Sequence, residues 1–492
     1  MEERHLVAID IGTSKIALTV AKVDGDNVQI VYYRETPSNG IKFSRVYIPG
    51  RASEAIRTAV REAEEELGIK ITQVIVGLPK YEVRQEIATM SVTRDPGVCI
   101  TSEEIGNIKD MAIETYPLEN EDRDMLFGAV AQSFSDGVDF QIVEHDVIGM
   151  ATDKLDSYFK VFVGQRKYVK DLRLAFHNAD GICISREYFT PDAIAKAVLY
   201  DSETENGVAL IDLGAGVTSV SIYYGSIMRH YATIPFGGRS ITSDIKTECY
   251  IPERLAENIK LAYGACMPEK LQNLSEKTLQ INSDTAVPVK QISVKYLSEI
   301  ITARVREIVD AVMYEIQESG FADSLRSGVV ITGGGANMLN IGNFIKDVSG
   351  YNVRTGYPKH TFSTADESAE AVYDPGAAAS VGMIMMAKSE NINCLIPCGI
   401  SGAAEAVQED GEETDSPAGG SGTAGPGLDD EGRGNLFGYP EDTPDTDNGP
   451  KGTKRTGKGT KGNHGIRWVK KQIGNLFDTI NDTYNEISNE GV

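Results

Sequence analysis

Strand-like and helix-like patterns of apolar and polar residues alternate from residue 6 to about residue 390. The apolar runs Leu6–Ile11 and Ile16–Val23 predict two strands joined by a short turn. The amphipathic segment Ser53–Leu67 predicts a helix that Gly68 ends, and Val74–Leu78 predicts a buried strand. This alternation is typical of an α/β protein.

The same order of elements returns in the second half of the chain. Gly207–Leu213 and Val217–Tyr224 predict a second pair of strands around a glycine turn. A predicted helix, Ser298–Gln317, precedes a predicted strand, Gly328–Thr332, which leads into three glycines. Each half therefore opens with a strand that ends in an acid, a turn of small or hydroxyl residues, and a second strand. No repeat with a period of about 20 to 50 residues is visible, which argues against a solenoid.

A segment of mixed pattern separates the first half from its continuation. Its predicted strands are Ile87–Val92, Gln141–Val147 and Tyr158–Gly164, and its predicted helix is Ser102–Thr115. We interpret this segment as an inserted small α+β domain.

The charge of the chain is concentrated near its end. The 492 residues hold 48 Lys and Arg against 72 Asp and Glu, a net charge of −24. Residues 405–450 carry 13 acidic residues and one basic residue, whereas residues 451–492 carry eight basic and four acidic residues. The overall acidity disfavours a nucleic-acid partner. Glycine and proline make up a third of residues 405–465, a composition that favours a disordered linker, acidic and then basic, which we place at 393–464.

The last segment of the chain predicts an amphipathic helix over residues 465–488. Its apolar residues recur at helical spacing, and basic residues and a tryptophan cluster at its start. The basic, Trp-bearing end favours an anionic membrane surface as the partner, although apolar spacing alone would also suit a protein groove or a coiled coil. The candidate membrane residues are Ile466, Arg467, Trp468, Val469, Lys470, Lys471, Ile473, Leu476, Phe477 and Ile480.

Other residue classes exclude several kinds of protein. The six cysteines are scattered, which indicates buried free thiols in a reducing cytosol. The six histidines form no spaced pair, so the sequence gives no support for a metal site or a nucleophile triad. The chain shows neither a signal-peptide pattern nor an apolar run of about 20 residues. We expect a cytoplasmic protein without a transmembrane helix.

Three turns of small or hydroxyl residues each follow a buried apolar strand. They span residues 10–15, 212–218 and 332–336. Such turns let backbone N–H groups converge on phosphate oxygens, and an Asp at the end of each of the first two strands is suited to hold Mg²⁺ through water. One such turn alone is typical of a plain hairpin. The order and spacing of all three favour a phosphate site.

The three turns together resemble the phosphate-1, phosphate-2 and adenosine motifs of the actin, chaperone and sugar-kinase ATPase superfamily. Within it the chain is most similar to the bacterial FtsA family. Further local matches are Ser38-Asn39-Gly40, Val130-Ala131-Gln132, Ile234-Pro235-Phe236-Gly237-Gly238, Thr242–Ile245 and Ala256–Gly264. The similarity covers residues 5 to about 390, and the inserted segment lies where FtsA-like proteins carry a domain called 1C.

The resemblance implies a site for ATP and Mg²⁺. Asp10 and Asp212 would bind magnesium through water, and Gln132 lies where related ATPases keep a residue that orients the attacking water. The implied nucleotide contacts are Gly12, Thr13, Ser14 and Lys15 at the β and γ phosphates, Gly214, Ala215, Gly216 and Thr218 opposite them, Glu257 and Lys260 at the ribose and adenine, and the turn of Gly333, Gly334, Gly335 and Asn337 at the adenosine.

The second turn departs from the family pattern at three positions. Ala215 replaces a glycine, Val217 a threonine and Ser219 an aspartate. A methyl group at residue 215 would crowd the backbone approach to phosphate, and the lost carboxylate would weaken magnesium handling. We therefore expect ATP binding with slow or negligible hydrolysis.

The resemblance also implies a fold and its domains. We expect an actin-like two-lobed ATPase fold with an inserted α+β domain, a disordered linker and a C-terminal amphipathic helix. The first actin-like lobe, 1A, is expected at 1–82, 167–205 and 365–392, with the inserted domain 1C at 83–166. The second actin-like lobe, 2A, is expected at 206–250 and 320–364, with subdomain 2B at 251–319. The linker is expected at 393–464 and the helix at 465–488.

The function implied by the resemblance is that of a cell-division scaffold. Such a protein polymerises by self-association and tethers filaments of the tubulin-like FtsZ to the inner face of the cell membrane at the division site. The FtsZ C-terminal tail would bind subdomain 2B near Arg304 and Arg306, and later division proteins would bind domain 1C. The alternatives are a sugar-kinase-type phosphotransferase, which needs a carboxylate base near the phosphates, and a pilus-assembly ATPase, which would typically lack a lipid-binding helix.

Overall fold

The first half of the chain builds a six-stranded mixed sheet in a computed structural model that describes residues 4–138, 142–281, 290–365 and 367–397. Its strands, in spatial order, are β10 (Cys183–Tyr188), β6 (Gln73–Gly77), β1 (Arg4–Ile11), β2 (Lys15–Asp24), β3 (Asn27–Pro37) and β18 (Ser363–Thr364). β1, β2 and β3 form an antiparallel meander, and β6 and β10 continue the sheet in parallel beside β1. The strands predicted at Leu6–Ile11, Ile16–Val23 and Val74–Leu78 are confirmed.

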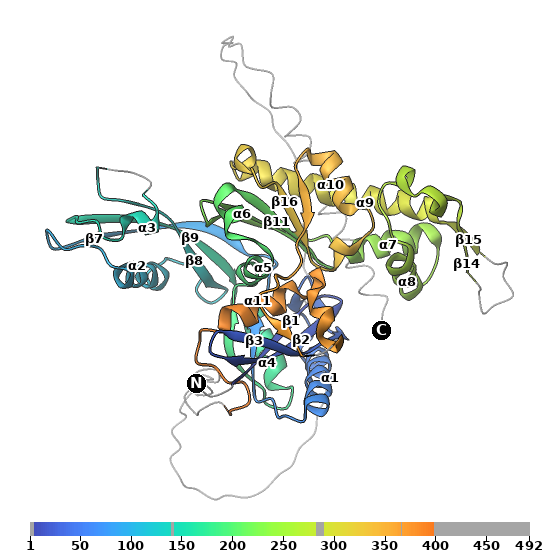
Figure 1. Ribbon diagram of the computed structural model, residues 1–492, viewed down its shortest axis with the longest axis horizontal. Coiled ribbons are helices and arrows are strands. Elements are labelled where there is room, and N and C mark those ends of the chain that lie inside the picture. The colour runs from blue at the N-terminus through green and yellow to red at the C-terminus, as the bar shows by residue number, and fades with distance from the viewer. Residues whose placement is uncertain (1–3, 139–141, 282–289, 366, 398–492) are drawn as a thin grey trace, which may run out of the picture. The chain divides into compact units, whose positions relative to one another are not determined.

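The second half builds a five-stranded sheet of the same topology. In spatial order its strands are β13 (Ile227–Ile234), β12 (Thr218–Tyr224), β11 (Val208–Leu213), β16 (Val329–Thr332) and β17 (Val353–Thr355). β11, β12 and β13 form the antiparallel meander, and β16 and β17 add in parallel beside β11. The β1–β2 turn and the β11–β12 turn therefore occupy equivalent positions in two repeated units. Figure 1 shows β1, β2 and β3 in the first sheet and β11 and β16 in the second.

Helices pack on these sheets and on one another. On the first sheet, α11 (Ala378–Ala387) contacts β1, β2, β6 and α5 (Thr190–Val198), while α1 (Pro49–Leu67) contacts α4 (Arg166–His177) and β3. The remaining helices of the second half are α6 (Asp201–Asn206), α7 (Gly238–Cys249), α8 (Glu253–Tyr263), α9 (Val294–Glu318) and α10 (Ile341–Ser349). Short hairpins are formed by β4 (Ile41–Lys42) with β5 (Arg45–Val46) and by β14 (Thr278–Ile281) with β15 (Lys290–Ser293).

Two predicted helices begin earlier than the sequence pattern indicated. α1 starts at Pro49, four residues before Ser53, because proline suits a first helical turn, where no N–H donor is needed. α9 starts at Val294, after Ser293, whose hydroxyl accepts a hydrogen bond from the N–H of Tyr296. Both helices therefore begin at residues suited to a helix start that apolar periodicity does not detect.

The inserted segment is an α+β domain, with one error in the predicted elements. Its sheet has the order β7 (Arg84–Thr93), β9 (Lys154–Gln165) and β8 (Asp124–Ser135), and its helices are α2 (Ser102–Glu114) and α3 (Glu144–Val147). The strand predicted at Gln141–Val147 is wrong, because Glu144–Val147 forms a helical turn that buries Val147 in the core of this domain. The third strand is β8, which the sequence analysis missed.

Three aromatic side chains join the inserted domain to both large sheets. Phe162 of β9 stacks on Phe189, which precedes α5, with ring centroids 4.6 Å apart. Tyr231 of β13 meets both rings edge-on, at 6.1 Å and 5.2 Å. All three side chains are buried. We call Phe162, Phe189 and Tyr231 the aromatic junction.

The boundary predicted for the linker is wrong by a few residues. The predicted linker begins at residue 393, but Cys394 is fully buried. Its N–H donates to the carbonyl of His5, and its own carbonyl accepts from the N–H groups of Thr72 and Gln73. The buried Cys394 and its backbone hydrogen bonds therefore belong to the first sheet's domain, and the described part of the chain continues to residue 397.

Several predictions fall wholly or partly outside the described residues. The rest of the linker and the amphipathic helix at 465–488 lie there, as does Cys398. Cys249, Cys266 and Cys394 are buried free thiols as predicted, but Cys99 is exposed and Cys183 is half-buried. In the part of the chain that the structure describes, no helix has the length and apolar character needed to cross a bilayer.

Candidate functional site

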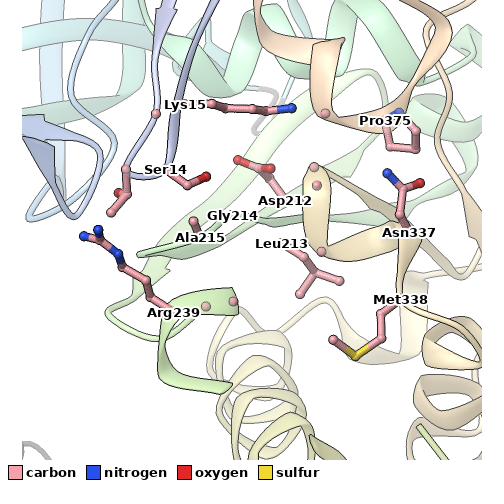
Figure 2. A pocket seen from close by; sticks show the side chains of 18 of the residues that line it. Ser14, Lys15, Asp212, Leu213, Gly214, Ala215, Arg239, Asn337, Met338 and Pro375 are labelled. Carbon is pink, nitrogen blue, oxygen red and sulfur yellow. The ribbon is translucent and has the colours of Figure 1, made fainter. Parts of the chain in front are cut away.

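A cleft of about 1250 Å³ lies where the two equivalent turns meet the third. Fifteen of the sixteen residues predicted to contact the nucleotide or its magnesium ion line it. They are Asp10, Gly12, Thr13, Ser14, Lys15, Asp212, Gly214, Ala215, Thr218, Glu257, Lys260, Gly333, Gly334, Gly335 and Asn337. Figure 2 shows Lys15 and Asp212 extending into the space between the turns, with Asn337 and Arg239 at its edges.

The first two turns close in the same way. The N–H of Gly12 donates to the carbonyl of Lys15 at 3.0 Å, and the N–H of Gly214 donates to the carbonyl of Val217 at 3.0 Å. Gly216, the one predicted residue that does not line the cleft, lies where the turns touch, because a Cβ at this position would fall 2.6 Å from Oγ1 of Thr13. The absence of a side chain at residue 216 therefore lets the first turn approach the second.

The third turn approaches the second strand pair through Gly333. Its φ angle is +79°, in the region that favours glycine, and an added Cβ would lie 2.3 Å from Oδ1 of Asp212. Gly334, the next residue, lines the cleft and has no heavy atom within 4 Å of an added Cβ. Gly333 is thus required by the fold, whereas Gly334 leaves room in the cleft.

A buried lysine that the sequence analysis missed enters the cleft beside the predicted magnesium residues. Nζ of Lys80 lies 2.7 Å from Oδ2 of Asp212, and both side chains are about a tenth exposed. Burial lowers the pKa of Lys80, but the carboxylates of Asp212 and Asp10 outweigh it and hold that pKa above its usual value. Lys80 therefore carries its positive charge in the cleft. It lies three residues after the end of β6, where no motif marks it.

The pKa of Asp10 is subject to opposing influences. Burial raises the pKa of Asp10, and the nearby Asp212 carboxylate raises it further, while Lys80 and Lys15 act in the opposite direction. Two acidic side chains at the ends of β1 and β11 therefore meet near one cation. This pairing follows from the topology, because both strands end at the cleft.

The other polar residues of the cleft are held by their neighbours. Lys260 donates to Oε2 of Glu257 at 2.7 Å and to the Gly238 carbonyl at 2.9 Å, and burial lowers its pKa. Lys15 pairs with Glu35, a residue the sequence analysis did not select. Further residues that it missed line the same cleft: Tyr33, Gly237, Gly238, Arg239, Thr242, Asp374, Pro375 and Gly376. Of these, Gly237 and Gly238 had a signal in the motif Ile234–Gly238, and Thr242 had one in the motif Thr242–Ile245.

The carboxylates of Asp374 and Glu35 also accept hydrogen bonds from neighbouring residues. Asn337 donates to Oδ2 of Asp374 at 2.8 Å, and the N–H of Gly376 donates to Oδ1 of the same residue at 2.7 Å. Tyr33 donates its hydroxyl hydrogen to Oε1 of Glu35 at 2.6 Å. The carboxylates of Asp212, Glu257, Glu35 and Asp374 therefore all have partners.

Gln132, the candidate for orienting an attacking water, lies elsewhere. It is the extra residue of a bulge in β8, between the pairs Ala131–Phe159 and Ser133–Tyr158. Its amide donates to the Met228 carbonyl at 3.0 Å, and its own carbonyl accepts from Arg229 at 3.0 Å. Gln132 does not line the cleft. Its contacts with β13 join the inserted domain to the second sheet, so the structure does not support the predicted catalytic position.

The two arginines chosen as partner contacts differ in their surroundings. Arg304 is mostly buried and donates to both carboxylate oxygens of Asp244, at 2.6 Å and 3.0 Å. Arg306 is exposed and lies over the ring of Phe344, with 5.1 Å from its guanidinium carbon to the ring centroid. Arg304 therefore has a structural partner already, whereas Arg306 faces solvent.

The side chains that the structure describes at this site would not hold a metal ion by themselves. Among the described residues, no three His, Cys, Asp or Glu side chains group as a metal site. Asp10 and Asp212 alone suit Mg²⁺, which is usually bound by one or two carboxylates together with waters and substrate phosphates.

Comparisons with known proteins identify the family. The family described as "Cell division protein FtsA" matches residues 209–382. A curated "Cell division protein FtsA" from Neisseria meningitidis is 31% identical over 388 residues, which cover 78% of this chain and 90% of that protein. The Escherichia coli protein of the same description is 23% identical over 80% of this chain and 92% of its own length.

A solved structure supports the fold independently. The "PilM-PilN type IV pilus biogenesis complex" matches with a TM-score of 0.52 and 16% identity, over 78% of this chain and 98% of that chain. At this identity the match shows the fold alone, and it agrees with the predicted actin-like architecture. The family follows from the sequence relatives: the chain belongs to the FtsA family of cell division proteins.

Proposed function

We propose that this cell-division protein binds ATP with Mg²⁺ in the cleft and acts as an actin-like scaffold that links FtsZ filaments to the cytoplasmic membrane. The observation that carries the nucleotide part is the convergence of three small-residue turns on one cleft. The cleft also contains cations from three different elements, Lys15, Lys80 and Arg239. Its volume of about 1250 Å³ is ample for a nucleotide.

The residues of the cleft fit this ligand. Backbone N–H groups of the first two turns, with Ser14 and Thr13, would hold the phosphates, and Lys15 would supply positive charge beside them. Asp10 and Asp212 would hold the metal ion through water. The bound metal would supply charge neutralisation at the phosphates.

Binding with slow turnover is favoured over phosphoryl transfer to a sugar. A transferase needs a carboxylate free to accept a proton from the attacking hydroxyl. In the cleft, Asp212, Glu35, Glu257 and Asp374 each accept hydrogen bonds from a protein donor. At residue 219, where the family pattern has an aspartate, the chain has Ser219, which is buried.

Two glycine-to-alanine variants test nucleotide binding in the cleft. In Gly334→Ala the added methyl group meets no protein atom within 4 Å, so it narrows the cleft without disturbing the fold. We expect its ATP affinity, measured by calorimetry with Mg²⁺, to fall by about tenfold or more with an unchanged melting temperature. Gly106→Ala on α2 is the control, since its methyl group also meets nothing but lies outside the cleft. ATP affinity that is equal in both variants and the wild type would argue against this site.

The membrane and FtsZ parts of the proposal are tested by liposome flotation. The intact chain is compared with a chain ending at His464, with and without ATP and an FtsZ tail peptide, on vesicles that contain anionic lipid. We expect only the intact chain to float and to carry the peptide with it. Equal flotation of both chains would rule out the tail as the anchor.

The FtsZ contact is tested on α9. We place it near the exposed Arg306 rather than the ion-paired Arg304, so Arg306→Ala should lower peptide recruitment while leaving flotation of the protein unchanged. Arg326→Ala, which removes an arginine that lies outside α9, is the matched control.

A further inference from the structure

Lys80 is fixed in the cleft by both halves of the protein. It follows β6, which runs parallel to β1, so the chain arrives at the sheet edge where Asp10 lies. The loop is held by the Thr190 hydroxyl, which donates to the Leu78 carbonyl at 2.7 Å. The hydroxyl of buried Tyr231, in the second sheet, donates to the Lys80 carbonyl at 2.9 Å.

The side chain of Lys80 meets the acidic residues that would serve a metal ion. Its Nζ lies 2.7 Å from Oδ2 of Asp212, and it also interacts electrostatically with Asp10. Lys80 is 9% exposed and Asp212 is 7% exposed. The carboxylates of Asp10 and Asp212 repel each other, and without a cation between them a divalent ion would be needed to offset this repulsion. The buried ammonium group of Lys80 supplies one positive charge at that place.

Other cations in the cleft are placed differently. Lys15 forms its ion pair with Glu35 and acts on Asp10 only as a nearby charge, and Lys260 forms its ion pair with Glu257. In the described part of the cleft, Lys80 is therefore the lysine that is ion-paired to one of these two aspartates.

We propose that Lys80 is a built-in counter-ion for Asp10 and Asp212, which makes ATP binding by this protein only weakly dependent on Mg²⁺. The inference rests on the proposed binding of ATP in the cleft. The ammonium group offsets the acidic pair before any ligand arrives, so phosphates can approach without a metal ion. A magnesium ion that does bind must share the site with this charge, which limits how much affinity it adds.

The test compares ATP affinity in excess Mg²⁺ and in EDTA for the wild type and for Lys80→Met. Calorimetry with ATP gives both values. We expect the wild type to lose less than about tenfold in affinity when Mg²⁺ is removed. Lys80→Met should lose at least about tenfold more than the wild type on removal of Mg²⁺, because its acidic pair is then uncompensated. Lys15→Met is the matched control, and its affinity should fall by a similar factor in both conditions.

A second measurement needs no nucleotide. Removing the lysine leaves Asp212 buried without its partner, so Lys80→Met should melt at a lower temperature, and millimolar Mg²⁺ should restore part of the loss. The wild type should change little with Mg²⁺. If Lys80→Met does not fold, Lys80→Gln keeps a hydrogen-bond donor for Asp212 without the charge and is measured in its place.

The outcomes separate this inference from the proposed function. An equal ratio of affinities with and without Mg²⁺ in the wild type and the variant overturns the role of Lys80 and leaves ATP binding intact. A wild type that binds no ATP in either condition overturns both proposals. The counter-ion role is supported if Mg²⁺ raises the melting temperature of Lys80→Met but not of the wild type, and if the ratio of ATP affinities with and without Mg²⁺ is larger in the variant.

Discussion

Truncation of Phe162 should cost much of the stability of the fold, because this ring joins three parts of the molecule. Phe162 is 1% exposed and contacts Phe189 and Tyr231 in the aromatic junction. A buried aromatic side chain removes about 150–250 Å² from water, and each ring pair adds about 0.5–1.5 kcal/mol. At about 25 cal/mol per Å², loss of most of that area amounts to about 3–5 kcal/mol, the range found for Phe→Ala in cores.

Urea unfolding followed by far-ultraviolet circular dichroism measures this effect. Tryptophan fluorescence is unsuited to it, since the single tryptophan is Trp468, outside the described residues. The expected loss for Phe162→Ala is about 3–5 kcal/mol in the free energy of unfolding. Ile87→Ala, on β7 of the same small sheet, removes a side chain that is 71% exposed and should cost less than about 0.5 kcal/mol. A loss below about 1 kcal/mol for Phe162→Ala would refute the view that the aromatic junction is a single packed unit.

Two further substitutions test individual polar contacts. The buried carboxylate of Asp124 accepts hydrogen bonds from Arg123 and Arg84, which lower its pKa to about 2. Its contribution is complete above the unfolded pKa of about 4 and is lost as the pH falls through about 2, so the melting-temperature gap between wild type and Asp124→Asn should be widest at pH 6 and shrink between pH 4 and pH 2. A gap independent of pH would contradict this. Tyr231→Phe removes the donor to the Lys80 carbonyl and should cost about 0.5–1.5 kcal/mol in urea unfolding, whereas a stabilised variant would mean that this hydrogen bond is not formed.

The sequence predicted the strands around the cleft well because each has a strong and regular pattern. Leu6–Ile11 and Gly207–Leu213 are apolar runs that end in a turn with few bulky side chains, so pattern and turn agree. Residues of β8 gave no such signal. Bulges between Leu126 and Gly128 and between Ala131 and Ser133 shift the alternation twice within one strand. A period of two cannot be detected across such shifts.

Site residues were predictable where the backbone conformation requires a particular residue type, such as glycine. They were not predictable where a residue matters only because of the side chain it contacts. Glycines at turns are visible in the sequence because few residues allow such close approach. Lys80 and Glu35 are ordinary charged residues in the sequence, and their importance comes only from their partners: Asp212 lies 132 residues from Lys80, and Lys15 lies on the strand beside that of Glu35. For Gln132 the prediction failed in the opposite way. A family motif suggested a catalytic role, but Gln132 contacts Met228 and Arg229 and not the cleft.

The position of Cys394 determines where a mechanical load on the end of the chain would enter the fold. A pull on the chain beyond residue 397 reaches first the hydrogen bond from Nε2 of Gln73 to the Ile396 carbonyl, and then the backbone hydrogen bonds that join Cys394 to His5, Thr72 and Gln73. These bonds lie at the start of β1, whereas Asp10 lies near its other end, about 17 Å away at the rise of a strand. A tether at this place would therefore load the base of the first sheet while leaving the mouth of the cleft free of strain.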